Sequence, residues 1–202
     1  LGNYHIAIGD DSDPATHGKL LGFQADYWLD GGRTYECSLI VSDCLALRSD
    51  TAYSIPNWNC AADACRTNKT SNTSMRTMGM LQATLIVEDA IEAAAHSVNL
   101  PSHVVRAKNL YAQGERTPYG EPLASCYMRE VWDYTLEKSD FLARQKAVDE
   151  FNANNRWRKR GISLLPVKYG SGFNQASLEQ GGALIEVYSK EGSVLVRHGG
   201  VE

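Results

Sequence analysis

A polar loop and the turn after it are the residues whose types and spacing best suit ligand chemistry. The loop covers residues 67–74 and is rich in Asn, Ser and Thr. Five residues then lead into a long apolar-periodic stretch: Met75, Arg76, Thr77, Met78 and Gly79. Backbone amides that converge at a helix N-terminus form a natural anion site, and a glycine allows close approach to a bound group. The alternative is a turn that only caps the helix.

The sequence contains no comparable pattern for binding a metal ion or for activating a nucleophile. The five histidines lack the spacing of paired metal ligands such as HxxxH, and GxSxG, GxGxxG and P-loop motifs do not occur. The acidic run at residues 10–13 lacks the ligand pattern of a calcium loop, which favours a solvated turn. We therefore expect neither a metal-ligating nor a catalytic side chain in this segment.

The composition is that of an ordinary globular protein, with 43% hydrophobic and 22% charged residues among 202. This length suits one domain or two small lobes. The net charge of −4 gives no basic field that would attract nucleic acid. The cationic run at residues 156–160 is the local exception, and it favours a solvated helix end over a phosphate-binding patch.

The compartment is indicated by the cysteines and by the absence of targeting signals. Five cysteines are an odd number without a CxxC pair, which suits a reducing compartment. The longest apolar stretch, residues 81–98, is interrupted by charged and polar residues, which excludes a membrane span. No targeting segment is recognisable, so we predict a cytoplasmic protein with no membrane partner.

Hydrophobic periodicity predicts an α+β fold in the order strands, helices, strands. We divide the chain into a β-hairpin region (1–33), an irregular segment containing the polar loop (34–79), a helical region (80–160) and a β region (161–202). The predicted strands cover residues 4–8, 20–29, 162–173, 183–188 and 194–198. The predicted helices cover residues 80–98, 101–109, 125–137 and 139–154, with a short helix possible within 34–50. Ser139 is the predicted N-cap of the last helix.

Several spaced motifs resemble the molybdopterin-binding part of the xanthine dehydrogenase/aldehyde oxidase family. Residues 53–57 resemble its YxIPN segment, 65–68 its C(R/K)TN, and 71–79 its SNTAFRGFG. Four further segments match in order and spacing: residues 105–111, 143–152, 157–161 and 182–188. The resemblance covers nearly the whole chain.

The resemblance implies a large oxidoreductase that hydroxylates purines, N-heterocycles or aldehydes with oxygen taken from water. Its cofactors would be molybdopterin-bound molybdenum, 2Fe-2S clusters and often FAD, with the last two outside this chain. The family's molybdenum has no protein side-chain ligands, so missing His and Cys clusters do not argue against it. The partners implied are the rest of the parent enzyme, a small-molecule substrate and, in a homodimer, a second copy of the parent.

The resemblance also assigns candidate site residues. Arg76 matches the family's cofactor-contacting Arg, so the cofactor-binding residues would be Arg76, Met75, Thr77 and Gly79. Met78 matches an aromatic that packs on substrate, and Asp43 matches an Arg that orients purines. Replacement of both aromatics and of that cation disfavours a purine and favours an aldehyde or other small substrate.

The family's remaining machinery has no counterpart here. Its catalytic Glu belongs to a GGFGGKE-like motif that does not occur, and its MGQG segment would follow residue 202. We therefore expect an internal fragment that is not active alone. The alternatives are a diverged structural or assembly component without cofactor, and an independent α+β module of 202 residues.

Overall fold

The computed structural model describes residues 2–170 and 181–199, and the chain divides into two compact units at residues 169 and 170. Among the described residues, the first unit holds a three-stranded sheet and five helices, and the second a two-stranded hairpin. This content confirms the predicted α+β class. In the described part of the chain, each helix is too short or too polar to cross a bilayer.

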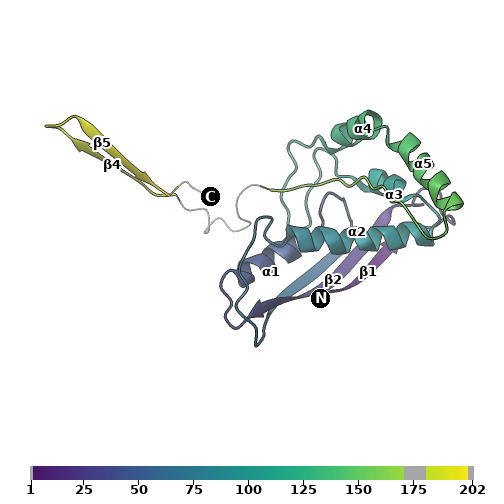
Figure 1. Cartoon of the computed structure of the whole chain (residues 1–202), viewed down its shortest axis with the longest axis horizontal. Helices are drawn as coiled ribbons and strands as arrows, with labels where there is room; N and C mark the ends of the chain where they lie inside the picture. Colours follow the sequence, from purple (N-terminus) through teal and green to yellow (C-terminus); the bar gives the residue numbers. More distant parts are fainter. Residues whose placement is uncertain (1, 171–180, 200–202) are drawn as a thin grey trace. The chain divides into compact units, whose positions relative to one another are not determined.

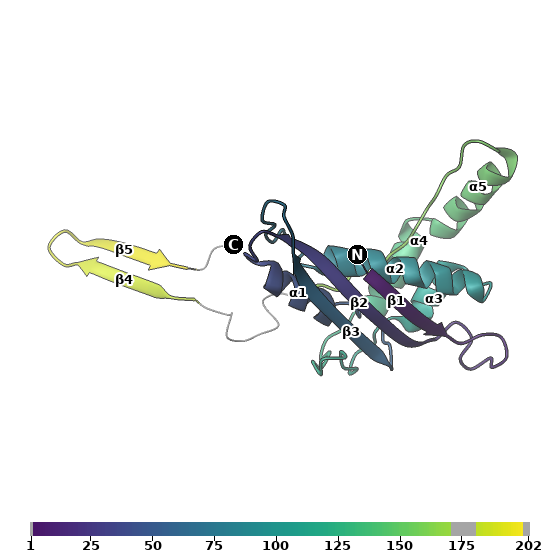
Figure 2. The same ribbon diagram turned by 90° about the horizontal axis from the view of Figure 1, so that it is seen from below.

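The sheet has the strand order β1-β2-β3, with β2 in the middle (Figure 2). β1 (Gly2–Ile8) pairs antiparallel with β2 (Leu20–Gly32), which confirms the N-terminal hairpin. β3 (Trp58–Arg66) pairs in parallel with β2, where we predicted an irregular stretch. That prediction was wrong because β3 lacks branched residues and gains its order by pairing with β2.

Two helices cover one face of this sheet (Figure 1). α1 (Ser38–Leu47) is the crossover that two adjacent parallel strands require. α2 (Met80–Ser97) confirms the longest predicted helix and packs beside β1 and α1. Buried apolar side chains of the sheet, of the helices and of the segments between them form the core: Leu20, Phe23, Ala25, Tyr27, Leu45, Tyr53, Ile55, Ala83, Val87, Ala90, Ile91, Ala95, Val105, Leu110 and Trp132.

Three further helices complete the first unit: α3 (Ser102–Asn109), α4 (Met128–Lys138) and α5 (Phe141–Asn154). They confirm the predicted helices with small shifts of their ends. Ser139 is not the N-cap of α5, because Asp140 holds that position. Ser139 is the C-cap of α4 and still has helical backbone angles, whereas an N-capping residue typically has an extended backbone.

Residues 161–170 form no strand, so this part of the predicted strand 162–173 was wrong, and 171–173 lie outside the described residues. Among residues 2–170 and 181–199, no strand pairs with this segment, and side chains attach it instead. Lys168 forms an ion pair with Asp50, whose side chain is 0% exposed. The Arg48 guanidinium lies 5.0 Å from the centroid of the Tyr169 ring. The segment is therefore held by charge and aromatic contacts.

The second unit is a hairpin of β4 (Ala183–Tyr188) and β5 (Ser193–His198). It confirms the predicted C-terminal pair of strands. Several apolar side chains on it are exposed: Leu184, Ile185, Val187, Val194, Leu195 and Val196. An isolated two-stranded hairpin is marginally stable in water.

Candidate functional site

The turn that enters α2 is closed by its own backbone. Met78 N donates to Met75 O at 3.1 Å, and Met80 N donates to Thr77 O at 2.7 Å. Gly79 is the N-cap of α2, and no side chain caps the helix. Two amides near the helix start are therefore already bonded within the turn.

Three consecutive residues of this turn have a left-handed backbone. The φ angles of Thr77, Met78 and Gly79 are 79°, 30° and 84°. Only glycine adopts this region without steric cost, and a β-branched residue suits it least. Thr77 occupies the position where the motif of the resembled family has its first glycine. The fold therefore keeps a glycine-type turn without that glycine, at a cost in strain.

Replacing Thr77 with Gly should stabilise the chain by about 1 kcal/mol, because relief of the left-handed strain exceeds the extra freedom of glycine in the unfolded state. Thr77 is exposed, so little packing is lost. Urea denaturation followed by tryptophan fluorescence would measure the change. The matched control is Thr73→Gly, at an exposed position without positive φ, which should destabilise the chain. A Thr77→Gly variant no more stable than the parent chain would contradict the strain.

A cavity of about 460 Å³ lies beside the turn, between β2, α1 and the first half of α2. Its polar lining comes from Asp30, Ser38, Asn72, Thr73 and Gln82. Its apolar lining includes Trp28, Val41, Leu45, Leu85 and Ile86. A concave site with mixed lining of this kind suits a small organic ligand.

The structure brings part of the predicted site together. Met75 and Gly79 line the cavity, and Met75 is 59% exposed. Arg76 and Thr77 are exposed on the same turn and Met78 is half-buried, but these residues do not line the cavity. Arg76 has no hydrogen bond or ion pair with a residue in the described part of the chain. Its guanidinium is therefore available to an anionic ligand.

Asp43 lies apart from this group. It is exposed on α1 and does not line the cavity. Ser38, Val41 and Leu45 form the cavity-facing side of α1, and the helical repeat places Asp43 on the opposite side. The structure therefore does not bring Asp43 together with the turn.

The backbone of Gly79 lies against the backbone of α1 and not against open space. A Cβ atom on Gly79 would lie 2.6 Å from Val41 O and 2.7 Å from Leu45 N. The backbone of the turn is thus in contact with α1. The sequence predicts that this glycine allows approach to a ligand, and the contact seen in the structure is with a helix.

Asp30 is the cavity residue that the sequence patterns did not single out. The predicted strand at residues 20–29 ends just before it. In the structure Asp30 accepts hydrogen bonds from Thr67 Oγ1 and Lys69 Nζ, both at 2.6 Å. The bonds from Lys69 and Thr67 lower the pKa of Asp30 to about 2. The available signal was the charge complementarity of Asp30 and Lys69, which are 39 residues apart.

The described residues outside the turn show neither a metal-ion cluster nor an activated Cys60 thiol. Within residues 2–170 and 181–199, His, Cys, Asp and Glu form no group of three or more that could hold a metal ion. The five cysteines are free, and burial raises the pKa of the Cys60 thiol to about 11. A thiol with such a pKa is a poor nucleophile at neutral pH. The turn and its cavity are therefore the best candidate site.

Comparison with known proteins gives matches along most of the chain. Residues 5–110 and residues 134–202 each match a family model described as a molybdopterin cofactor-binding domain. The chain is 39% identical to xanthine dehydrogenase of Oryza sativa subsp. japonica over 202 residues, which are 100% of the chain and 14% of that enzyme. It is 38% identical to aldehyde oxidase 4 of Rattus norvegicus over 202 residues, which are 100% of the chain and 15% of that enzyme.

Solved structures give a similar fold at lower identity. The aldehyde oxidoreductase from Desulfovibrio gigas has a TM-score of 0.62 and 20% identity, over 77% of the chain and 16% of that protein. Quinoline 2-oxidoreductase from Pseudomonas putida 86 has a TM-score of 0.60 and 18% identity, over 76% of the chain and 20% of that protein. The chain thus spans about one seventh of the length of the curated relatives it matches.

Proposed function

Because the chain belongs to the molybdopterin cofactor-binding domain family, we propose that it works as part of a molybdenum hydroxylase of the xanthine dehydrogenase/aldehyde oxidase type. The whole enzyme would hydroxylate an aldehyde or an N-heterocycle with oxygen taken from water. The observation that carries this proposal is the exposed Arg76 on a turn beside a cavity of about 460 Å³. The 202-residue chain would not be competent alone, because no catalytic residue is assigned to it.

The residues present fit a molybdopterin group. Arg76 offers a planar set of donors to an anionic cofactor, and Met75, Thr77 and Gly79 would form the adjoining surface of the turn. Asn72, Thr73 and Gln82 supply further polar groups in the cavity. The bound cofactor supplies the two-electron redox chemistry. The chain's own contribution is to bind and orient it and to cover one side of it.

The substrate side of the site favours a small molecule over a purine. Met78 is half-buried on the turn, and its thioether is a flexible apolar contact without the flat face of an aromatic ring. Asp43 remains a predicted substrate contact from the resemblance alone, and its place on the far side of α1 argues against it. An aldehyde is therefore the substrate class that we favour.

Further partners are proposed for the parent enzyme. Its 2Fe-2S clusters and FAD would bind outside this chain. We propose a cytoplasmic homodimer with neither nucleic acid nor membrane as a partner, consistent with the net charge of −4 and the free cysteines. Cell fractionation and the oligomeric state of the full-length protein would test these points.

The second candidate function is a structural or assembly component that has lost the cofactor. The strained Thr77 at a glycine position favours this alternative, because a turn selected for cofactor binding would be expected to keep its glycine. Elemental analysis of the full-length protein for molybdenum distinguishes the two. A stoichiometric metal content supports the enzyme, and its absence supports the scaffold.

Replacing Arg76 with Ala tests the cofactor assignment directly. Loss of a charge-assisted hydrogen bond costs about 1.5–3 kcal/mol, so cofactor affinity should fall about tenfold or more. We expect lower molybdenum content per protein and lower turnover of the full-length enzyme. Arg129→Ala is the matched control, because Arg129 is also exposed but lies on α4, outside the turn and the cavity. Unchanged molybdenum content together with unchanged turnover would refute the role of Arg76.

A further inference from the structure

The turn at residues 75–79, which contains Arg76, is called the cofactor turn below. The loop before it, residues 67–74, is attached to the end of β2 through Asp30. The two carboxylate oxygens of Asp30 accept from Thr67 Oγ1, Lys69 Nζ and the backbone amide of Gly32, at 2.6, 2.6 and 3.1 Å. The backbone oxygen of Asp30 accepts from Asn72 Nδ2 at 2.6 Å. One residue thus bonds the loop at three positions: 67, 69 and 72.

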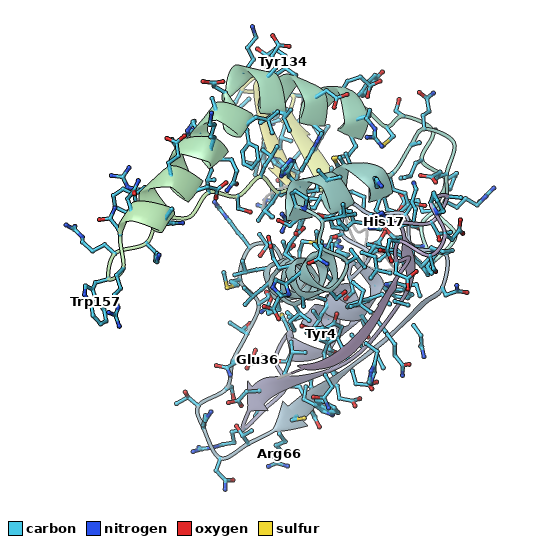
Figure 3. All side chains as sticks on the ribbon, turned by 90° about the vertical axis from the view of Figure 1, so that its right-hand side faces the viewer. Tyr4, His17, Glu36, Arg66, Tyr134 and Trp157 are labelled. Atoms are coloured by element: carbon cyan, nitrogen blue, oxygen red, sulfur yellow. The ribbon has the colours of Figure 1, made fainter. Side chains whose placement is uncertain are left out.

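The backbone around Asp30 adds a second set of contacts to the same loop. Gly31 O accepts from Asn72 N at 3.1 Å, and Gly32 O accepts from Thr67 N at 2.9 Å. A Cβ atom on Gly32 would lie 2.2 Å from Thr70 O, so the two chain segments touch directly. In Figure 3, Arg66 at the end of β3 and Glu36 before α1 mark this end of the sheet.

The cofactor turn is therefore held at both ends. Asn72 is bonded to the end of β2 on one side, and Gly79 lies against α1 on the other. Arg76 lies midway between these two attachments and is exposed. Resting on the proposed function, we propose that Asp30 is a positioning residue, which holds the loop so that Arg76 is presented to the cofactor. Preorganised donors bind tighter because less ordering accompanies binding.

The ionised form of Asp30 is the one that makes these bonds. The bonds from Lys69 and Thr67 lower its pKa to about 2, whereas an unfolded Asp titrates near about 3.9. Because the pKa of Asp30 is lower in the folded chain, its ionised carboxylate stabilises the folded loop fully at a pH above the pKa of the unfolded chain. This stabilisation is lost as the pH falls through the pKa of the folded chain. The attachment should therefore be complete above about pH 4 and lost near about pH 2.

Asp30→Asn in the full-length protein tests the proposal. The variant loses the ion pair and an anionic acceptor, so amide exchange of residues 67–78 should accelerate about tenfold. Molybdenum per folded protein should fall at least about twofold, because a looser loop binds less tightly. The thermal midpoint should change little, which separates positioning from global stability. Asp30→Glu keeps the carboxylate and should restore part of the molybdenum content.

The matched control is Asp26→Asn, which removes the same charge from an exposed position on β2 and should change neither exchange nor metal content. Unchanged loop exchange in Asp30→Asn would overturn the attachment. Faster exchange with full molybdenum content would overturn the positioning role while leaving the proposed function standing. A wild-type protein without molybdenum would overturn the proposed function, and the role of Asp30 with it.

Discussion

Replacing Arg106 with Leu should cost the chain about 3–5 kcal/mol of unfolding free energy, because it leaves a buried carboxylate without its cation. Arg106 is 2% exposed. Its Nε donates to Glu88 Oε2 at 2.7 Å, and its Nη2 donates to Glu92 Oε1 at 2.6 Å. Tyr53 OH donates to the other oxygen of Glu88 at 2.6 Å. These bonds join α2, α3 and the segment between α1 and β3.

Urea denaturation at pH 7 would measure the loss. In the wild type, burial and the Glu88 carboxylate raise the pKa of the Tyr53 hydroxyl, so Tyr53 stays a donor at this pH.

Two further variants identify the cause of the Arg106 effect. Glu92→Gln should cost less than about 1 kcal/mol, because the Glu92 side chain is half exposed and solvated pairs contribute little. Adding Glu88→Met to Arg106→Leu should recover part of the loss, since no buried charge is left unpaired, although the Tyr53 hydroxyl loses its acceptor. If the double variant is no more stable than Arg106→Leu alone, the loss comes from packing and not from the buried charge.

Replacing Gly79 with Ala should destabilise the chain by about 3 kcal/mol, from a left-handed backbone and from overpacking against α1. The φ of Gly79 is 84°, and the added methyl carbon would lie 2.6 Å from Val41 O. The atoms of Val41 and Leu45 that meet it belong to backbone, so α1 or the turn must shift. The same shift would move the cofactor turn, so molybdenum content of the full-length protein should fall as well.

Gly114→Ala is the matched control for Gly79. Gly114 has a φ of 89°, and a methyl group added there would meet nothing within 4 Å, so only the backbone strain of about 1–2 kcal/mol applies. Denaturation of both variants should therefore separate conformational strain from the collision. Equal losses in the two variants would show that α1 accommodates the methyl group.

Local patterns predicted those elements whose order comes from their own residues. The apolar repeat over residues 80–98 predicted α2, because a helix buries one face every three to four residues. Apolar alternation predicted β1, β2 and the β4–β5 hairpin. The turn at residues 74–79 was recognised from its motif, and it is exposed enough to meet a ligand.

Partners far apart in the sequence were not predictable from such patterns. β3 becomes a strand by pairing with β2, and the segment at residues 161–170 lacks a strand for want of such a neighbour. Asp43 shared an alignment position with a substrate contact, but the helical repeat of α1 turns it away from the cavity.

The sequence by itself determined the helices α2 to α5, the two hairpins and the family to which the turn belongs, because period and motif are properties of neighbouring residues. It left α1 open. Only the tertiary structure decided what holds the turn in place. Asp30 bonds residues 37, 39 and 42 positions away, and Gly79 meets the backbone of α1. Such contacts depend on the three-dimensional arrangement of the strands and helices. A local repeat of residue types does not predict that arrangement.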